Sequence, residues 1–304
     1  MSDKKKSQSL FSGLEEFGLE KLDRISLYEK EQTKPEASTQ KKKEKSEEDF
    51  LFDKKVDCPV CNSEVMTRMV KRSLLRIVSR DSDSMPIYEG INPLFYDVWL
   101  CNQCGYAASE KQFRQKLLKE QVIEIQQRIT AKWRPKNYPS LYHADIALER
   151  FKLALYNAVV RKARDSEVAM LCLKMAWVYR SKEDTENELQ CLKQALVGFE
   201  KAFSQERFPI VGMDECGLMY LIGELYRRTG DFTTALRWFG RVIINPQAKP
   251  SIKDKARDQK YMITEIMEEK EKTEATIETN AEGESRANQN KKGLGRFFSI
   301  GLTN

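Results

Sequence analysis

The chain has 304 residues, of which 32% are charged and 40% are hydrophobic, and its formal net charge is +6. This composition is too polar for a membrane-spanning protein and too apolar for a chain that is disordered throughout, and the length suits about two domains of ordinary size. A charge of +6 spread over this length does not by itself indicate nucleic-acid binding.

Cysteine and histidine usage restricts the compartment and the site chemistry. Seven cysteines, an odd number in a chain that is not small, do not predict a secreted disulfide framework. No apolar stretch typical of a signal peptide follows the charged first residues, and no run reaches the ~18 apolar residues of a membrane-spanning helix. We therefore expect a protein of the reducing cytoplasm. The single histidine, His143, provides no second imidazole for a two-histidine metal site and is expected to begin a helix.

Residues 1–54 are rich in Lys, Glu, Ser and Gln, which predicts a disordered N-terminal tail. Apolar residues recur at near-helical spacing between Leu10 and Tyr28. This segment is interpreted either as a transient helix or as a docking peptide that folds on a partner. The first interpretation is favoured, because short isolated helices are marginal in water.

Two Cys-x-x-Cys units predict a metal site in residues 55–108. The units are Cys58 with Cys61 and Cys101 with Cys104. Two residues between ligands let one tight turn present both sulfurs to one ion, and Gly105 supplies the positive φ that such a turn tends to need. Four thiolates make a closed tetrahedral site, for which one structural Zn²⁺ is expected. The segment between the pairs is longer than the ~15–20 residues of a compact zinc ribbon, but the cost of loop closure grows only logarithmically.

A redox dithiol and an iron–sulfur site are competing interpretations of the same cysteines. A thioredoxin-like motif has one Cys-x-x-Cys at the start of a helix, whereas both units here lie among turn and strand signals, including 64–70 and 95–100. Structural zinc is therefore favoured. A metal held by four thiolates has no open position and cannot activate water.

A row of arginines lies between the cysteine pairs. Its members are spaced by four residues: Arg68, Arg72, Arg76 and Arg80. This spacing puts them on one face of a helix or strand. With the aromatic residues that follow them, they suggest an RNA-binding zinc ribbon that contacts phosphates and stacks on bases. A solvated face paired to Asp81, Asp83 and Glu89 is the favoured alternative, because these acids dilute the basic patch.

The rest of the chain is predicted to be helical. Residues 109–135 are predicted to form a connecting helix, because Ser109 and Gln112 have capping-box spacing and Pro135 ends the segment. Residues 136–271 form a helical domain of six segments. The breaks are placed near Asp165, Glu183, 208–213, Gly230-Asp231 and Asn245-Pro246.

Within this domain, residues 221–242 have the residue order of a tetratricopeptide repeat. Gly223 is expected to let paired helices approach, Gly230-Asp231 to form the turn, and Phe239 to fill the next groove. A weaker copy begins at Ala176, which matches Gly223 at an offset longer than the ~34 residues of the usual repeat. An irregular helical bundle is the alternative, and the repeat is favoured.

Stacked helix pairs of this kind expose a concave surface lined by the first helix of each pair. The register of the pattern places six residues there: Trp177, Arg180, Tyr220, Glu224, Arg227 and Arg228. This mixture predicts a surface that binds an acidic or aromatic peptide.

Residues 272–304 are predicted to be a flexible C-terminal tail with an apolar end around Phe297 and Phe298. This end is interpreted either as a segment that docks into a partner or a neighbouring copy, or as disordered chain.

Four motifs of the chain are considered together: Cys-Pro-Val-Cys at 58–61, Asn-Pro-Leu-Phe-Tyr-Asp-Val-Trp at 92–99, Cys-x-x-Cys-Gly-Tyr-Ala-Ala at 101–108, and Gly-Met-Asp-Glu at 212–215. With the Tyr-Leu-Ile-Gly-Glu-Leu-Tyr-Arg-Arg helix that follows, they resemble an uncharacterised bacterial family catalogued as domain of unknown function 2225. The resemblance covers about residues 55–270. It implies a bacterial source and a zinc ribbon followed by tetratricopeptide-like helices, and it implies no known activity.

We therefore expect an α+β fold that is mostly α, with a small zinc-ribbon-like β module, a tetratricopeptide-like helical domain and disordered tails. The expected function is a non-enzymatic cytoplasmic adaptor or scaffold that binds one Zn²⁺ and a protein or peptide partner. Nucleic-acid binding through the arginine row is the alternative. Catalysis is the least favoured, because the sequence shows no paired-carboxylate constellation, phosphate-cradling glycine loop or nucleophile elbow.

Overall fold

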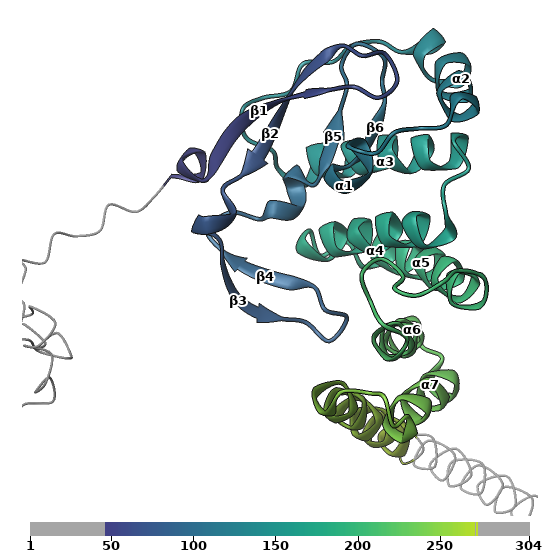
Figure 1. Ribbon diagram of the computed structural model, residues 1–304. Coiled ribbons are helices and arrows are strands. Elements are labelled where there is room, and N and C mark those ends of the chain that lie inside the picture. The colour runs from purple at the N-terminus through teal and green to yellow at the C-terminus, as the bar shows by residue number, and fades with distance from the viewer. Residues whose placement is uncertain (1–45, 271, 273–304) are drawn as a thin grey trace, which may run out of the picture. The chain divides into compact units, whose positions relative to one another are not determined.

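A computed structural model describes residues 46–270 and residue 272 of the chain (Figure 1). Short strands come first and helices follow, so the predicted fold class, mostly α with small antiparallel strand pairs near the N-terminus, is confirmed. The apolar stripe at 10–28 and the apolar end at 293–302 lie outside the described residues. Within the described part of the chain, no helix is long and apolar enough to cross a membrane.

The strands form three separate antiparallel pairs. They are β1 (Leu51–Asp57) with β2 (Glu64–Val70), β3 (Arg76–Arg80) with β4 (Pro86–Glu89), and β5 (Val98–Leu100) with β6 (Ala107–Ser109). The predicted tail was extended too far, to residue 54, because β1 already begins at Leu51. Leu51 is buried and pairs with Val70, and a 3-10 helix, η3 (Glu47–Phe50), precedes it.

The predicted connecting helix over 109–135 is wrong as a single element. Three shorter elements take its place: α1 (Glu110–Phe113), α2 (Lys119–Arg128) and the 3-10 turn η6 (Thr130–Lys132). The Phe113 ring lies in the core, 5.8 Å from the ring of Trp99 and 5.1 Å from that of Tyr106. This contact fixes the end of α1, and the chain restarts at Leu118, whose N–H donates to the side chain of Gln121 at 3.0 Å. Long-range packing thus overrides the local helical pattern.

The six predicted helical segments are confirmed. They are α3 (Ala144–Val160), α4 (Asp165–Ser181), α5 (Thr185–Gln205), α6 (Glu215–Thr229), α7 (Phe232–Ile244) and a helix over 250–270. The helices follow one another in space in chain order (Figure 1). His143 is the N-cap residue of α3, as expected.

Two of the turns between helices have the same backbone. Glu183 and Gly230 both adopt positive φ, 59° and 93°, and the aspartates after them have almost identical angles, φ −85° and ψ 79° for Asp184 and φ −87° and ψ 78° for Asp231. Each aspartate side chain accepts a hydrogen bond from the N–H three residues later. The turns between α4 and α5 and between α6 and α7 therefore share one backbone geometry and one side-chain cap, while the tetratricopeptide repeat itself stays a prediction.

Glycines mark the closest approach within each helix pair. A Cβ added to Gly223 of α6 would lie 3.0 Å from the ring of Phe239 on α7. A Cβ added to Gly198 of α5 would lie 2.8 Å from Ala169 on α4. The expected role of Gly223 is thus observed, since a larger residue would push α6 and α7 apart.

Candidate metal centre

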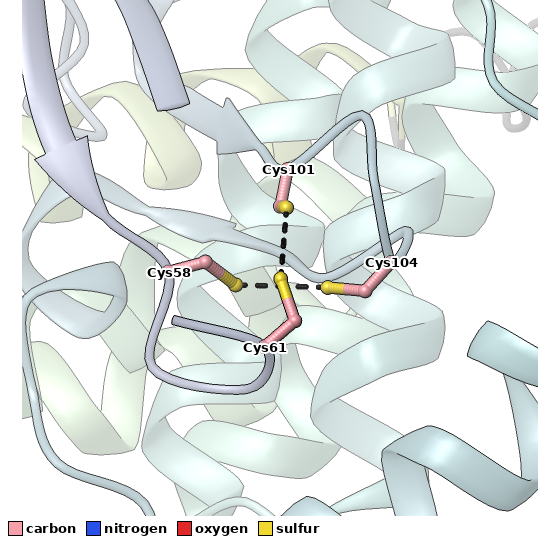
Figure 2. Close-up of side chains that lie close together, drawn as sticks. All are labelled: Cys58, Cys61, Cys101 and Cys104. Carbon is pink, nitrogen blue, oxygen red and sulfur yellow. Dashed lines mark hydrogen bonds between the residues drawn. The ribbon is translucent and has the colours of Figure 1, made fainter. Parts of the chain in front are cut away.

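The four paired cysteines converge on one point (Figure 2). Their Sγ atoms all lie within 4.8 Å of one another, and the Cys58–Cys104 and Cys61–Cys101 sulfur pairs are 3.6 Å apart. A tetrahedral zinc ion with Zn–S bonds of ~2.3 Å separates its sulfurs by ~3.8 Å, so the spacing fits such an ion. Three of the sulfur-bearing residues are buried and Cys61 is half-buried, so the site is closed from solvent on most sides.

Both cysteine turns have the same hydrogen bonds, although they lie far apart in the chain. The N–H of the first cysteine donates to the carbonyl five residues later, at 3.0 Å for Cys58 and 2.8 Å for Cys101. The N–H four residues after the first cysteine donates to its carbonyl, at 2.9 Å in both turns. That residue has positive φ in each case, 56° for Asn62 and 77° for Gly105. The predicted role of Gly105 is confirmed, and asparagine tolerates the same conformation.

The thiols perturb one another strongly. The pKa of Cys101 is lowered, first because of its hydrogen bonds with the thiols of Cys104 and Cys58, and also because the backbone N–H groups of Cys104 and Gln103 face it. The pKa of Cys58 is raised to about 12, first because of its hydrogen bond with Cys101. The thiols of the cluster therefore do not ionise independently of one another. A cation that binds all four sulfurs must displace the remaining protons, which makes binding depend on pH.

The second cysteine turn is held by side chains that the sequence analysis missed. Thr130, Trp133 and Asn157 each donate a hydrogen bond to a carbonyl oxygen within 101–105, at 2.9, 2.9 and 3.1 Å. A Cβ added to Gly105 would lie 2.6 Å from the Trp133 ring, so the indole packs directly on the turn. These residues come from η6, the segment after it, and α3. Among them, only Asn157 left a local signal, as a polar side chain on the buried face of a helix.

The arginine row does not share one face. Arg68 lies on β2, Arg72 in a 3-10 turn (Arg72–Leu74), and the other two on β3. The chain leaves β2 after Val70, so the four-residue spacing runs across three elements. Three of the arginines make ion pairs, Arg68 with Asp53 at 2.8 Å, Arg72 with Glu110 at 2.9 Å and Arg76 with Glu89 at 3.3 Å. The expected pairing of the row with Glu89 is therefore observed for one arginine.

Asp81 and Asp83 were expected to pair with the arginine row. They contact the helices α4 and α6 instead. They belong to the hairpin tip, residues 81–85 between β3 and β4, which contacts α4 and α6 (Figure 1). The six residues predicted for a concave surface lie on these two helices and are here called the α4–α6 surface: Trp177, Arg180, Tyr220, Glu224, Arg227 and Arg228. The structure thus brings the six residues together, with the hairpin tip against them. Their binding of a partner stays a prediction.

Arg180 is the centre of this contact. Its terminal nitrogens donate to Asp81 and Asp83, both at 2.7 Å, while its Nε donates to Glu188 at 2.7 Å. The indole N–H of Trp177 donates to the same Asp83 carboxylate at 2.9 Å. The Asp83 side chain is completely buried, and these donors compensate its charge.

Arg228 of α6 is the second arginine that binds the hairpin tip. It donates to Asp81 at 2.6 Å and to Glu224 of its own helix at 2.7 Å, and Arg227 donates to the same glutamate. Burial opposes ionisation of Asp81, but Arg228, the N–H of Ser82 and Arg180 together hold its pKa below the usual value.

A family model described as an uncharacterised protein conserved in bacteria, DUF2225, matches residues 51–263. The matched range contains both cysteine pairs, the β3–β4 hairpin and the α4–α6 surface. No curated protein and no solved structure matches the chain.

Proposed function

Because this chain belongs to the bacterial family DUF2225, whose description assigns no activity, we propose its function from its own residues. The proposal is a non-enzymatic adaptor of the cytoplasm. Its cysteine cluster holds one structural Zn²⁺, and its helical half binds a protein or peptide. The observation that carries the proposal is that the α4–α6 surface already holds an acidic segment, through Arg180 on Asp81 and Asp83.

The proposed metal role follows from the ligand set. Four soft sulfur ligands in tetrahedral spacing suit zinc, and no open position is left on the ion for water or substrate. All seven cysteines are unpaired, which suits a reducing compartment. Binding at this site would join β1–β2 to the turn that η6 and α3 hold, and so would fix the strand region to the helices.

The helical half supports the binding role. Two helix pairs with the same turn geometry stack in chain order, as in tetratricopeptide-like arrays, which commonly present peptide-binding surfaces. In such arrays the first helix of each pair lines the concave side. Here α4 and α6 are the first helices of the two pairs, and they carry all six residues of the α4–α6 surface.

The metal proposal is tested by elemental analysis of protein purified without added metal. One zinc ion per chain is expected, with four of the seven thiols protected from a thiol reagent until a chelator is added. Iron in place of zinc, or less than about half an equivalent of metal with all seven thiols reacting freely, contradicts it.

The adaptor proposal is tested by cross-linking and mass spectrometry on the full chain in its native bacterium. Wild type is compared with Arg180→Glu, which reverses the charge at the centre of the α4–α6 surface. Arg72→Glu serves as the matched control, because its side chain is 79% exposed and lies outside that surface. A partner cross-linked to α4 or α6 and lost only in Arg180→Glu is expected. The same cross-links in all three proteins contradict the proposal.

Nucleic-acid binding is a second candidate, favoured by one observation. Arg76 and Arg80 both lie on β3, where every residue is exposed, and the Arg76 side chain is 81% exposed. The test is a gel shift with single-stranded RNA and duplex DNA in a salt series. Absence of binding at ~50 mM salt, where phosphate contacts are strong, removes this candidate.

A further inference from the structure

The β3–β4 hairpin is attached to the helices mainly by polar groups. Every residue of β3 is exposed, and the apolar side chains Ile77, Val78 and Ile87 are 43%, 65% and 46% exposed. The two strands form a sheet of their own, and two-stranded sheets are marginally stable alone. The hydrogen bonds and ion pairs to α4 and α6 come from the hairpin tip, and Met85 is its one large apolar side chain packed against the helical core.

The hairpin tip binds in the manner of a short acidic peptide. Its two aspartates, separated by one residue, meet the guanidinium groups of Arg180 and Arg228. Between them, the carbonyl of Ser82 accepts a hydrogen bond from Tyr220 at 3.0 Å. The Ser82 hydroxyl lies 2.6 Å from a Glu224 oxygen and 2.8 Å from Arg228. Side chains and backbone of the tip are thus both recognised.

The α4–α6 surface is pre-arranged from the helical side. Glu188 orients Arg180 through its Nε, and the completely buried Glu224 orients Arg227 and Arg228. With the tip removed, three arginines would face two glutamates, leaving unpaired guanidinium donors. Such donors match carboxylates in a bidentate geometry. The surface therefore selects carboxylates at the spacing that Asp81 and Asp83 provide.

We propose that the hairpin tip is an intramolecular ligand of the α4–α6 surface, and that the protein partner carries an acidic segment, with two carboxylates separated by one residue, that replaces it. The inference rests on the proposed function and names the chemistry of the partner. Because the hairpin is part of the same chain, the effective concentration of its tip at the α4–α6 surface is ~1 mM, which is typical of short linkers. Only a partner that outcompetes this tethered tip can bind, so the hairpin sets a threshold for engagement.

The direct test is binding of the hairpin sequence added in trans. The probe is a fluorescent peptide of residues 76–89, and the control peptide carries Asp81→Asn and Asp83→Asn. The full-length wild type is compared with a full-length variant that carries the same two substitutions in its own tip, so that the α4–α6 surface stays intact. The variant is expected to bind the probe at least ~10-fold more tightly than wild type does, and the control peptide weakly. Adding Arg180→Ala to the variant is expected to abolish binding, and raising salt to weaken it.

A permanently docked tip would give a different result. A folded, metal-loaded variant that binds the probe no better than wild type overturns the inference. A second measurement does not depend on the variant: hydrogen exchange of residues 76–89 in wild type is expected to speed up when unlabelled probe peptide is added in excess. Unchanged exchange at saturating peptide also overturns it.

The two proposals can fail separately. If the variant does not bind the probe but a cellular partner still depends on Arg180, the proposal that an acidic segment replaces the tip is wrong, and the adaptor function stands. If the probe binds the variant but no partner depends on Arg180, the tip is an exchangeable ligand and the adaptor function through this surface is wrong.

Discussion

The side-chain amide of Asn157 donates a hydrogen bond of 3.1 Å to the carbonyl oxygen of Gly105, so helix α3 holds the turn that carries Cys101 and Cys104. The same amide also donates to Leu153 of its own helix at 2.9 Å. Both ends of the bond to Gly105 are buried, so its loss would leave a carbonyl without a partner and without water. The metal site and the helices are thus coupled through this residue.

Asn157→Ala is therefore expected to lower the free energy of unfolding by ~1–3 kcal/mol, the cost of a buried polar group left unpaired. It is also expected to weaken metal retention against a chelator, because the second cysteine turn loses one of its three supports. Urea unfolding and chelator competition measure the two effects. Gln190→Ala, an exposed amide on α5, is the control and should change stability by less than ~0.5 kcal/mol. Equal effects of the two substitutions would contradict the coupling.

Gly105→Ala tests the packing of Trp133 on the second cysteine turn. Two costs are expected: the left-handed backbone, ~1–2 kcal/mol for a residue with a Cβ, and displacement of the indole that lies 2.6 Å from the new Cβ. Gly212→Ala is the matched control, because Gly212 also has positive φ, 85°, and has open space around it. We expect Gly105→Ala to be clearly more destabilising in urea unfolding and to reduce metal content. A similar loss in both variants would show that the indole moves away freely.

Gly223→Ala and Gly240→Ala form a second matched pair, with both glycines in helices. Alanine raises helix propensity at each position by ~0.5–1 kcal/mol. At Gly240 nothing lies near the added Cβ, so this substitution is expected to stabilise the protein. At Gly223 the Cβ meets Phe239 at 3.0 Å, and overpacking between α6 and α7 is expected to cost ~1–3 kcal/mol. Thermal unfolding should therefore show shifts of opposite sign, and stabilisation by both would contradict the close approach.

The elements that sequence reasoning placed correctly are those whose signals are local. Each cysteine turn is built from adjacent residues, and the need of one tetrahedral ion for two such turns predicts that they meet. The six helices follow from apolar periodicity and from turn residues such as Gly230-Asp231. These helices and turns can be predicted from neighbouring residues, with little knowledge of distant parts of the chain.

The errors arose where distant contacts decide the outcome. The segment 109–135 has a helical pattern, but the packing of Phe113 beside Trp99 ends α1 early. Asp81 follows Arg80 in the chain and was expected to neutralise the arginine row, yet it lies against Arg180 and Arg228. No local pattern links a hairpin tip to helices about a hundred residues later, so this contact required the three-dimensional structure.

Asp81→Asn is expected to destabilise the docked hairpin tip in a pH-dependent way. The pKa of Asp81 is lowered in the folded protein, because Arg228, the Ser82 N–H and Arg180 outweigh the opposing effect of burial. A lowered folded pKa means that the carboxylate adds stability above its unfolded pKa of ~3.9, and that this contribution is lost as the pH falls through the folded value. Because the side chain is 30% exposed, solvent screening limits the effect to about 1 kcal/mol or less.

Urea unfolding at pH 7, 5 and 3.5 measures this effect as the difference between wild type and Asp81→Asn. Loss of metal at acidic pH affects both proteins and cancels in the difference. Wild type should be more stable at pH 7 and 5, and the difference should become smaller at the lowest pH. Glu89→Gln, at the exposed base of the same hairpin, is the control and should change stability by less than ~0.5 kcal/mol at each pH. A difference that stays constant down to the lowest pH would show that the Asp81 carboxylate does not hold the tip by its charge.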